Sequence, residues 1–338
     1  MSNYFLPVFY VVLQLLIIIG IGFVVRKSGR WADNFFQGLS RLVVRVVLPF
    51  YFIVRVSQTD LSQIRVMLLM PVSAAIVVGT GLVLSLILFT ILPFRGSDRR
   101  AGIAMATFGN SGYMPLAIAE IVPLSVPLVG ERFGLEFPPI LIAAYLFVQS
   151  PVLWSVGRHI LTKSDTNRSG IRIRDLLSPP LVGILIGLAV ALSGLGKVLD
   201  NPALPIAPVF AALERLAAIT LPLALLNLGG LIGGLKVTRA ELKPLIGMTG
   251  AVALVRLVLL PGLFYACFFG FLRHWSLAPA VIFVLFLETH TPPATNLSLM
   301  AGEAGVNEHH TAVTILGSYL LYLLLMPVYL AVFLFITK

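Results

Sequence analysis

The sequence predicts an all-α polytopic membrane protein with ten transmembrane helices. Of its 338 residues, 58% are hydrophobic and 11% are charged, whereas a soluble globular domain carries roughly 25% charged residues. The mean hydropathy of +0.99 agrees with a membrane protein. Long apolar runs separated by short loops favour membrane-spanning helices over a membrane barrel. The single cysteine, Cys267, lies inside an apolar run, which excludes disulfides and cysteine-based metal sites.

Ten apolar segments are long enough to span a bilayer, which takes about 20 residues. They cover residues 6–25, 38–56, 67–92, 101–128, 138–160, 177–196, 207–234, 244–272, 277–302 and 311–336. The first segment is not a signal peptide, because its basic residues Arg26, Lys27 and Arg30 follow the apolar run instead of preceding it. We therefore expect an uncleaved first helix.

The basic residues of the loops predict the orientation in the membrane. Loops after the first, third, fifth and seventh segments carry about twice as many Lys and Arg as the opposite side. Because cytoplasmic loops are enriched in these residues, we expect both termini outside, with the 161–176 loop in the cytoplasm. Short loops favour a bacterial inner membrane. The net charge of +10 comes from these loops and indicates no nucleic-acid partner.

The two halves of the chain show an internal repeat. Leu-Pro in the second segment, at Pro49, recurs in the seventh, at Pro222, and other prolines repeat at nearly the same spacing. Five segments per repeat is an odd number, so the second copy must cross the membrane in the opposite sense. We expect five-helix repeats at 1–160 and 177–338, joined by the linker 161–176. Inverted repeats are typical of secondary transporters; the alternative is an old duplication in a non-transporting membrane protein.

The fourth and ninth segments are interrupted at their centres by Gly and Pro, in residues 108–115 and 287–296. Proline removes a backbone donor and clashes with the preceding turn, so each helix should break there. Thr291 followed by Pro292 predicts an N-cap and the first residue of a new half-helix. Asn110 or Ser111 can cap the corresponding start in the fourth segment.

Two half-helix N-termini are thus expected to meet at the membrane midplane. Their free N–H groups and positive dipole ends favour an anion. Broken backbone at this depth is tolerated where it is buried in protein or lines a cavity. The alternative is a pair of simple proline kinks. The predicted binding residues for a carboxylate-sized anion are Asn110, Ser111, Gly112, Tyr113, Pro115, Thr291, Pro292, Pro293 and Asn296.

The two broken helices, the ten-segment plan and the run Thr-Pro-Pro-Ala-Thr-Asn at 291–296 resemble the auxin efflux carrier family, which includes plant PIN-FORMED carriers and a bacterial branch. The resemblance covers essentially the whole chain. It implies a fold shared with bile-acid symporters, in which helices 4 and 9 cross within a transport domain of helices 3–5 and 8–10. That domain moves against a scaffold of helices 1, 2, 6 and 7, and the scaffolds join a homodimer.

One departure from the plant members concerns substrate specificity. They place Asn directly before Pro at the first crossing, whereas four residues separate Asn110 from Pro115 in this sequence. The resemblance therefore implies a role at the crossing for Asn110 and Pro115, without the specificity for auxin.

Ionisable residues within predicted spans are candidates for coupling. Glu288, directly before the second break, can bind a proton or help to ligate Na⁺; alternatively it is a structural carboxylate paired with an arginine. His290 can carry protons or serve in packing. Glu120 is a second coupling group or a satisfied buried acid. Arg256 can contact the substrate, but an internal ion pair with Glu288 or Glu120 is favoured.

Other chemistry finds little support in the sequence. His309 and His310 with nearby glutamates indicate a solvated loop and not a metal site. No phosphate-binding loop, zinc-hydrolase motif or nucleophile–base set occurs, so we expect no enzyme, no cofactor and no ATP coupling.

The sequence thus predicts a secondary transporter for small organic anions that works by an elevator-type alternating-access mechanism. Efflux of an auxin-like or other monocarboxylate is the first interpretation. A proton- or sodium-coupled permease for dicarboxylates such as malonate is the alternative within this class. A membrane ligand sensor that does not transport is the alternative from another class.

Overall fold

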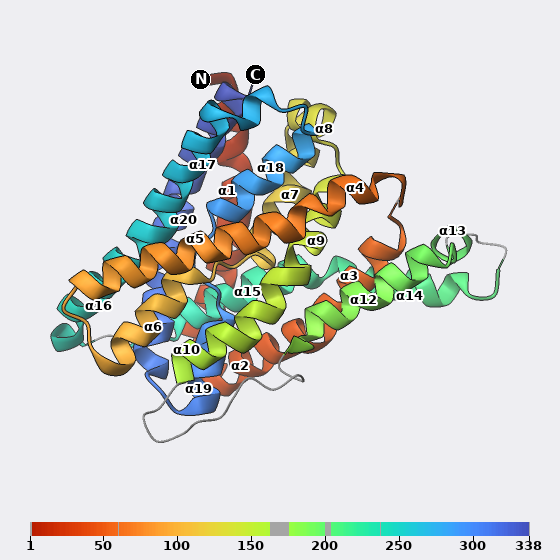
Figure 1. Cartoon of the computed structure of the whole chain (residues 1–338). Helices are drawn as coiled ribbons and strands as arrows, with labels where there is room; N and C mark the ends of the chain where they lie inside the picture. Colours follow the sequence, from red (N-terminus) through yellow and green to blue (C-terminus); the bar gives the residue numbers. More distant parts are fainter. Residues whose placement is uncertain (1, 60, 163–175, 200–203, 237, 338) are drawn as a thin grey trace.

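The computed structural model describes residues 2–59, 61–162, 176–199, 204–236 and 238–337 (Figure 1). Most of the predicted 161–176 linker therefore lies outside the described residues. Within the described ranges the chain is helical, and the one extended pairing is an isolated bridge between Gly109 and Pro293. The first helix begins and the last helix ends at the same end of the molecule (Figure 1).

Helix occurs in each of the ten predicted segments. In chain order the helices are α1 (Ser2–Lys27), α2 (Asp33–Leu42), α3 (Leu48–Ser57), α4 (Ile64–Met67), α5 (Leu69–Ile91), α6 (Gly96–Thr107), α7 (Tyr113–Ser125), α8 (Pro127–Phe133), α9 (Phe137–Val152), α10 (Arg158–Thr162), α12 (Pro179–Leu192), α13 (Gly196–Leu199), α14 (Ala207–Ala218), α15 (Thr220–Gly233), α16 (Arg239–Ala253), α17 (Leu260–Gly270), α18 (Pro279–Thr289), α19 (Asn296–Ala304) and α20 (Glu308–Ile336).

Six helical stretches among the described residues are long and apolar enough to cross a membrane, or seven if the sharply bent pair α7 and α8 counts as one. The prediction of ten uniform spans is therefore only partly reproduced. The second predicted span carries Arg41, Arg45 and Arg55, and the sixth is a short helix, α12. The fourth and ninth are divided by their Gly- and Pro-rich breaks.

Three of the long helices that contain prolines without breaking have a widened turn beside the proline. These π-helical turns are Val43–Val47 before Pro49, Leu153–Gly157 after Pro151, and Leu254–Leu259 before Pro261. Because proline cannot donate to the preceding turn and clashes with it, a local widening of the helix relieves the conflict. α2 therefore continues into α3, α9 into α10 and α16 into α17.

The helices pack in two groups, which also contact each other, since α1 packs on α20 and α12 on α9. α1 lies along α15, and α3 packs on α12 and α14. In the second group α5 packs on α6 and α9, α18 on α9, and α16 on α20. Glycines permit the closest approaches of the first group: a Cβ at Gly229 would meet the backbone of Ile19, and one at Gly183 would meet the backbone of Pro49.

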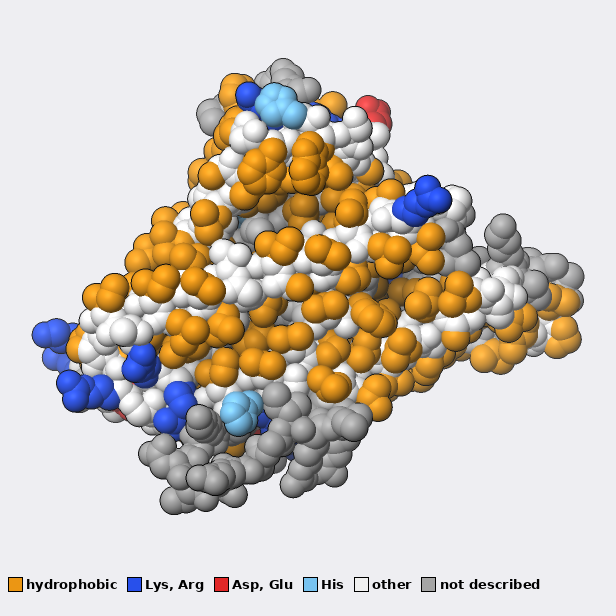
Figure 2. Space-filling view, in the orientation of Figure 1, with side chains coloured by type: hydrophobic (Ala, Val, Ile, Leu, Met, Phe, Trp, Pro, Cys, Tyr) orange, Lys and Arg blue, Asp and Glu red, His pale blue; other side chains and the backbone are white. Residues whose placement is uncertain are grey.

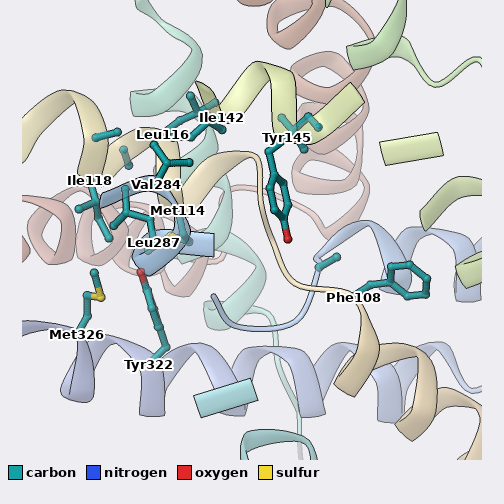
Figure 3. Packing of buried hydrophobic residues seen from close by; sticks show 14 of the residues in the cluster. Phe108, Met114, Leu116, Ile118, Ile142, Tyr145, Val284, Leu287, Tyr322 and Met326 are labelled. Carbon is teal, nitrogen blue, oxygen red and sulfur yellow. The ribbon is translucent and has the colours of Figure 1, made fainter. Parts of the chain in front are cut away.

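The apolar residues form both the core and the outer surface. Side chains of α7, α9, α18 and α20 pack together in the interior (Figure 3). Large apolar side chains such as Ile76, Ile87 and Leu324 are more than half exposed. Apolar side chains cover much of the face seen in Figure 2, and Lys and Arg lie towards its edges. A surface of this kind belongs in lipid, so the chain is an integral membrane protein.

Candidate functional site

The two broken helices cross in the interior of the protein. The segment that joins α6 to α7 runs against the segment that joins α18 to α19. The amide of Asn110 donates to the carbonyl of Pro292 at 2.8 Å, and the amide of Ala294 donates to the carbonyl of Phe108 at 2.9 Å. These bonds supply partners for backbone groups that the broken helices leave free. Four helix ends therefore meet at one point, which we call the crossing.

The crossing requires glycine at position 109. A Cβ atom on Gly109 would overlap the guanidinium of Arg256 and the hydroxyl of Thr291. The side-chain amide of Gln149, on α9, also donates to the backbone carbonyl of Gly109 at 3.0 Å. The backbone of this residue is therefore enclosed from three directions.

Arg256 binds the C-terminal ends of the two incoming half-helices. It lies in the widened turn of the helix that α16 and α17 form, and 1% of it is exposed. Its guanidinium donates to the carbonyl of Thr291 at 3.0 Å, to the hydroxyl of Thr291, and to the carbonyl of Thr107 at 3.4 Å. Thr107 ends α6, and Thr291 follows the end of α18. The positive charge therefore lies where both helix dipoles are negative.

Arg256 was expected to form an ion pair with Glu288 or Glu120. Within the described part of the chain it forms no ion pair with a carboxylate, and it binds the helix ends instead. Sequence reasoning had no means of placing the carbonyls of Thr107 and Thr291 beside it.

The start of α7 agrees with the prediction. The side-chain oxygen of Asn110 accepts from the amide of Tyr113 at 3.1 Å and so caps the helix. The side-chain amide of Asn110 donates to the hydroxyl of Tyr319, on α20. Tyr319 was missed by the sequence analysis, because a tyrosine within an apolar span carries no signal of its own.

The predicted start of the second half-helix is wrong. α19 begins at Asn296 and not at Pro292. A residue before proline avoids the helical region, and two consecutive prolines hold this stretch extended. Thr291 consequently follows the end of α18 and does not start α19. Its hydroxyl donates to the carbonyl of Glu288 at 3.1 Å.

Three neighbouring cavities lead away from the crossing. The first, of about 30 Å³, is lined by Gly109, Asn110, Ser111, Gly112, Tyr113 and Asn296, among others. The second, of about 20 Å³, shares Tyr113 with the first. The third, of about 130 Å³, shares Thr295 and Leu231 with the second and reaches Arg26 at the end of α1. The three cavities therefore lie one after another between the crossing and the end of the molecule at which Arg26 lies.

The predicted binding residues divide into two sets. Those that line the first cavity are Asn110, Ser111, Gly112, Tyr113 and Asn296. The other four are buried around it and line none of the three cavities: Pro115, Thr291, Pro292 and Pro293. Their part in the site is to shape the backbone.

Glu288 is fully buried beside the crossing, in the last turn of α18. Neither of its carboxylate oxygens has a hydrogen-bond partner among the residues that the structure describes. The Ser111 hydroxyl is nevertheless close enough to stabilise the carboxylate by a weak hydrogen bond, and the Arg256 guanidinium interacts with it through its charge. Glu288 lines none of the three cavities.

His290 points away from the cavities, into an aromatic enclosure. Its Nδ1 lies 2.7 Å from the carbonyl of Phe286, and its Nε2 has no partner within the described ranges. Ring centroids of Phe286, Tyr329, Tyr265 and Phe264 lie 4.3, 4.9, 5.4 and 5.7 Å from that of the imidazole. This environment fits the packing role better than a direct contact with substrate.

Glu120 has partners on another helix. Its carboxylate accepts from the hydroxyl of Tyr51 at 2.6 Å and from the guanidinium of Arg55 at 2.7 Å. Both partners belong to α3, whereas Glu120 belongs to α7. A second ion pair, Arg45 to Glu303 at 3.3 Å, joins the same long helix to α19. Glu120 is therefore a satisfied acid that connects two helices.

His309 and His310 lie in the first turn of α20 and not in a loop. Each stands 3.7 Å from a carboxylate, Glu241 and Asp98 respectively. No group of three or more His, Cys, Asp or Glu in the described ranges is arranged to hold a metal.

Comparison with known proteins gives a family and several relatives. The model of the membrane transport protein family matches residues 7–123 and 168–330. The chain is 30% identical over 166 residues to Protein PIN-LIKES 7 of Arabidopsis thaliana, which covers 48% of this chain and 41% of the relative. It is 30% identical over 155 residues to Protein PIN-LIKES 1 of the same plant, covering 45% and 32%. The matches thus span less than half the length of these plant relatives.

An archaeal relative is matched over more of its length. The chain is 26% identical over 223 residues to an uncharacterized transporter of Methanothermobacter thermautotrophicus, which covers 64% of this chain and 66% of the relative.

Proposed function

Because this chain belongs to the membrane transport protein family, that of the auxin efflux carriers, we propose that it is a secondary transporter for small organic anions. Family membership makes it a membrane transporter. The observation that carries the choice of an anion is the polarity of the crossing: Arg256 binds the C-terminal ends of α6 and α18, while the N-terminal ends of α7 and α19 face the cavities.

The first cavity suits a carboxylate. Helix N-termini carry a positive dipole end, which favours an anion. The N–H groups of Tyr113, Leu297 and Ser298 already have acceptors, so the anion would be held by the dipole ends and the polar side chains. Asn110, Ser111 and Asn296 add polar side chains to the lining. A space of about 30 Å³ holds about two water-sized groups, which is the size of a carboxylate group alone. The remainder of the substrate then extends into the second and third cavities.

An elevator-type mechanism is supported by the helix packing. We assign α1, α2–α3, α12 and α14–α15 to a scaffold, and the remaining helices, with the crossing, to a transport domain. In this assignment each of the two five-helix repeats, 1–160 and 177–338, contributes helices to both parts, and the repeats cross the membrane in opposite senses. The chain starts and ends on one side of the molecule, as an even number of crossings requires (Figure 1). A homodimer joined through the scaffolds completes the proposal.

The direction of the cavities supports an inward-facing state. The third cavity reaches Arg26, and basic residues mark the cytoplasmic side of a membrane protein. In a bacterial inner membrane both termini would then lie in the periplasm, and the substrate would reach the crossing from the cytoplasm.

The burial of Glu288 favours the alternative in which transport is coupled to an ion gradient. A fully buried carboxyl can take up and release a proton as its surroundings change. Arg256 already supplies a positive charge to the carbonyls of the crossing, so no sodium ion is needed there. A proton-coupled permease for a dicarboxylate such as malonate is therefore the second candidate, ahead of a sodium-coupled one.

The experiment measures transport in proteoliposomes, as membrane current and tracer flux, for indole-3-acetate, lactate and malonate. Asn110→Ala removes a cap of α7 and a polar group of the site, so we expect it to abolish transport of the acid that the wild-type protein carries. Asn34→Ala, at an exposed position on α2, is the matched control and should transport normally. Saturable binding without flux would instead favour the ligand sensor.

A further inference from the structure

Asn227 is a polar residue buried in the apolar helix α15. It is 6% exposed, and its side-chain amide donates to the hydroxyl of Ser40, on α2, at 3.1 Å. Its side-chain oxygen has no hydrogen-bond partner in the described part of the chain. A buried polar atom without a partner costs free energy unless something else satisfies it.

Asn227 lines the second cavity, which also reaches the crossing. Its lining includes Asn227 and Ser40, from α15 and α2, together with Tyr113 and Thr295, at the starts of α7 and α19. The rest of the lining is apolar, formed by Val43, Ala224, Leu228 and Leu231. The cavity therefore brings the Asn227–Ser40 pair close to the helix ends of the crossing, and apolar side chains form the rest of its lining.

The chemistry of the pair leaves one hydrogen-bonding position open. The hydroxyl of Ser40 can both donate and accept, so either end of the Asn227 carboxamide can pair with it. The other end then remains for a ligand, as a donor or as an acceptor. Ser40 thereby orients Asn227 without using up its hydrogen-bonding capacity.

We propose that Asn227, oriented by Ser40, determines the specificity of the transporter by binding a second polar group of the substrate. The substrate class is an organic acid with an apolar body that carries a hydroxyl or a ring N–H away from its carboxylate. This role rests on the carboxylate site proposed above. A site built to bind such a group strongly rejects analogues that lack it, because its own polar atom is then left unpaired.

The test compares acids in matched pairs that differ in that one group: 4-hydroxyphenylacetate with phenylacetate, and indole-3-acetate with 1-naphthaleneacetate. Uptake and competition are measured in proteoliposomes. We expect the wild-type protein to prefer the polar member of at least one pair by about tenfold or more. Asn227→Leu should reduce that preference to near one while transport of the apolar member persists. Ser40→Ala should reduce it partly.

Thr220→Val is the matched control. Thr220 lies on the same helix, is fully buried and also has a hydroxyl without a partner in the described ranges, but it lines none of the three cavities. Its substitution should leave the preference unchanged. An equal loss of both members of a pair in Asn227→Leu would mean a structural role and overturn the inference. So would a preference near one for both pairs in the wild-type protein, a measurement that needs no variant.

The two proposals fail in different ways. If Asn110→Ala abolishes transport while Asn227→Leu keeps the wild-type preference, only the role of Asn227 is wrong. If Asn110→Ala transports every acid normally, the carboxylate site itself is wrong. Should Asn227→Leu not fold, Asn227→Thr keeps a hydroxyl but shortens the side chain, and the same comparison of preferences decides.

Discussion

At the scale of single residues, the crossing depends on one missing side chain and one buried charge. Gly109 leaves the space that the guanidinium of Arg256 and the hydroxyl of Thr291 occupy. Arg256 in turn binds the ends of two half-helices, in addition to the backbone hydrogen bonds that pair the two segments. Backbone and charge thus fit each other beside the first cavity, which Gly109 also lines.

Gly109→Ala should destabilise the protein. The new Cβ forces Arg256 or the paired backbone to move, and such overpacking typically costs about 1–3 kcal/mol. We expect a lower melting temperature of the purified protein in detergent. Gly262→Ala is the control, because a Cβ at Gly262 in α17 meets nothing within 4 Å. Equal melting temperatures for the two variants would contradict the close approach at Gly109.

Arg256→Met should be more harmful than Arg256→Lys. Methionine fills similar space but leaves the carbonyls of Thr107 and Thr291 without a donor, and hydrogen bonds to charged groups contribute about 1.5–3 kcal/mol each. Lysine keeps the charge but lacks the planar fork that reaches several acceptors. The melting temperature should therefore be highest for the wild-type protein, lower for Arg256→Lys and lowest for Arg256→Met. Equal melting temperatures for Arg256→Met and the wild-type protein would show that the helix ends need no charge.

At the scale of elements, the long helix formed by α2 and α3 is tied to the crossing helices at two places. Arg55 and Tyr51 bind Glu120 of α7, and Arg45 binds Glu303 of α19. The first connection is the more buried, since the side chain of Glu120 is 20% exposed and that of Arg55 is 38% exposed, against 30% and 57% in the second pair. In an elevator these ties would have to change whenever the transport domain moves.

Glu120→Gln should reduce the population of the observed state. Accessibility from the Arg26 side is measured by thiol labelling of Ser298→Cys, which lines the third cavity, in a Cys267→Ser background. We expect slower labelling in Glu120→Gln, because one tie that holds this state is weakened. Glu303→Gln is the control, since exposed ion pairs contribute little. Unchanged labelling in Glu120→Gln would mean that the tie does not distinguish between states.

At the scale of the whole molecule, the proposed role of Glu288 is to couple movement to protons. Gln has the same shape but cannot take up a proton, so Glu288→Gln should lose uphill accumulation of substrate driven by a pH gradient. Exchange of labelled for unlabelled substrate at equal pH should persist. Both are measured by tracer flux in proteoliposomes, with Glu303→Gln as the control. Accumulation that survives in Glu288→Gln would assign coupling to another group or to none.

The sequence predicted much of the fold and part of the site. Helix lies in all ten predicted segments, and the breaks fall at the expected Gly- and Pro-rich runs, because apolar length and proline chemistry are local properties. Asn110 was correctly expected to cap α7. The start of α19 was misplaced, because two consecutive prolines pair as extended backbone with a segment from the other half of the chain.

The sequence by itself determined that this chain lies in a membrane, where its helices break, and to which family it is similar. These follow from composition, proline positions and a few motifs. Only the tertiary structure decided what each buried polar group binds: Arg256 the helix ends, Glu120 the side chains of α3, and Asn227 the hydroxyl of Ser40. The reason is physical. A polar group in an apolar interior takes whichever partner the folded backbone brings within reach, and that partner lies far away in the sequence.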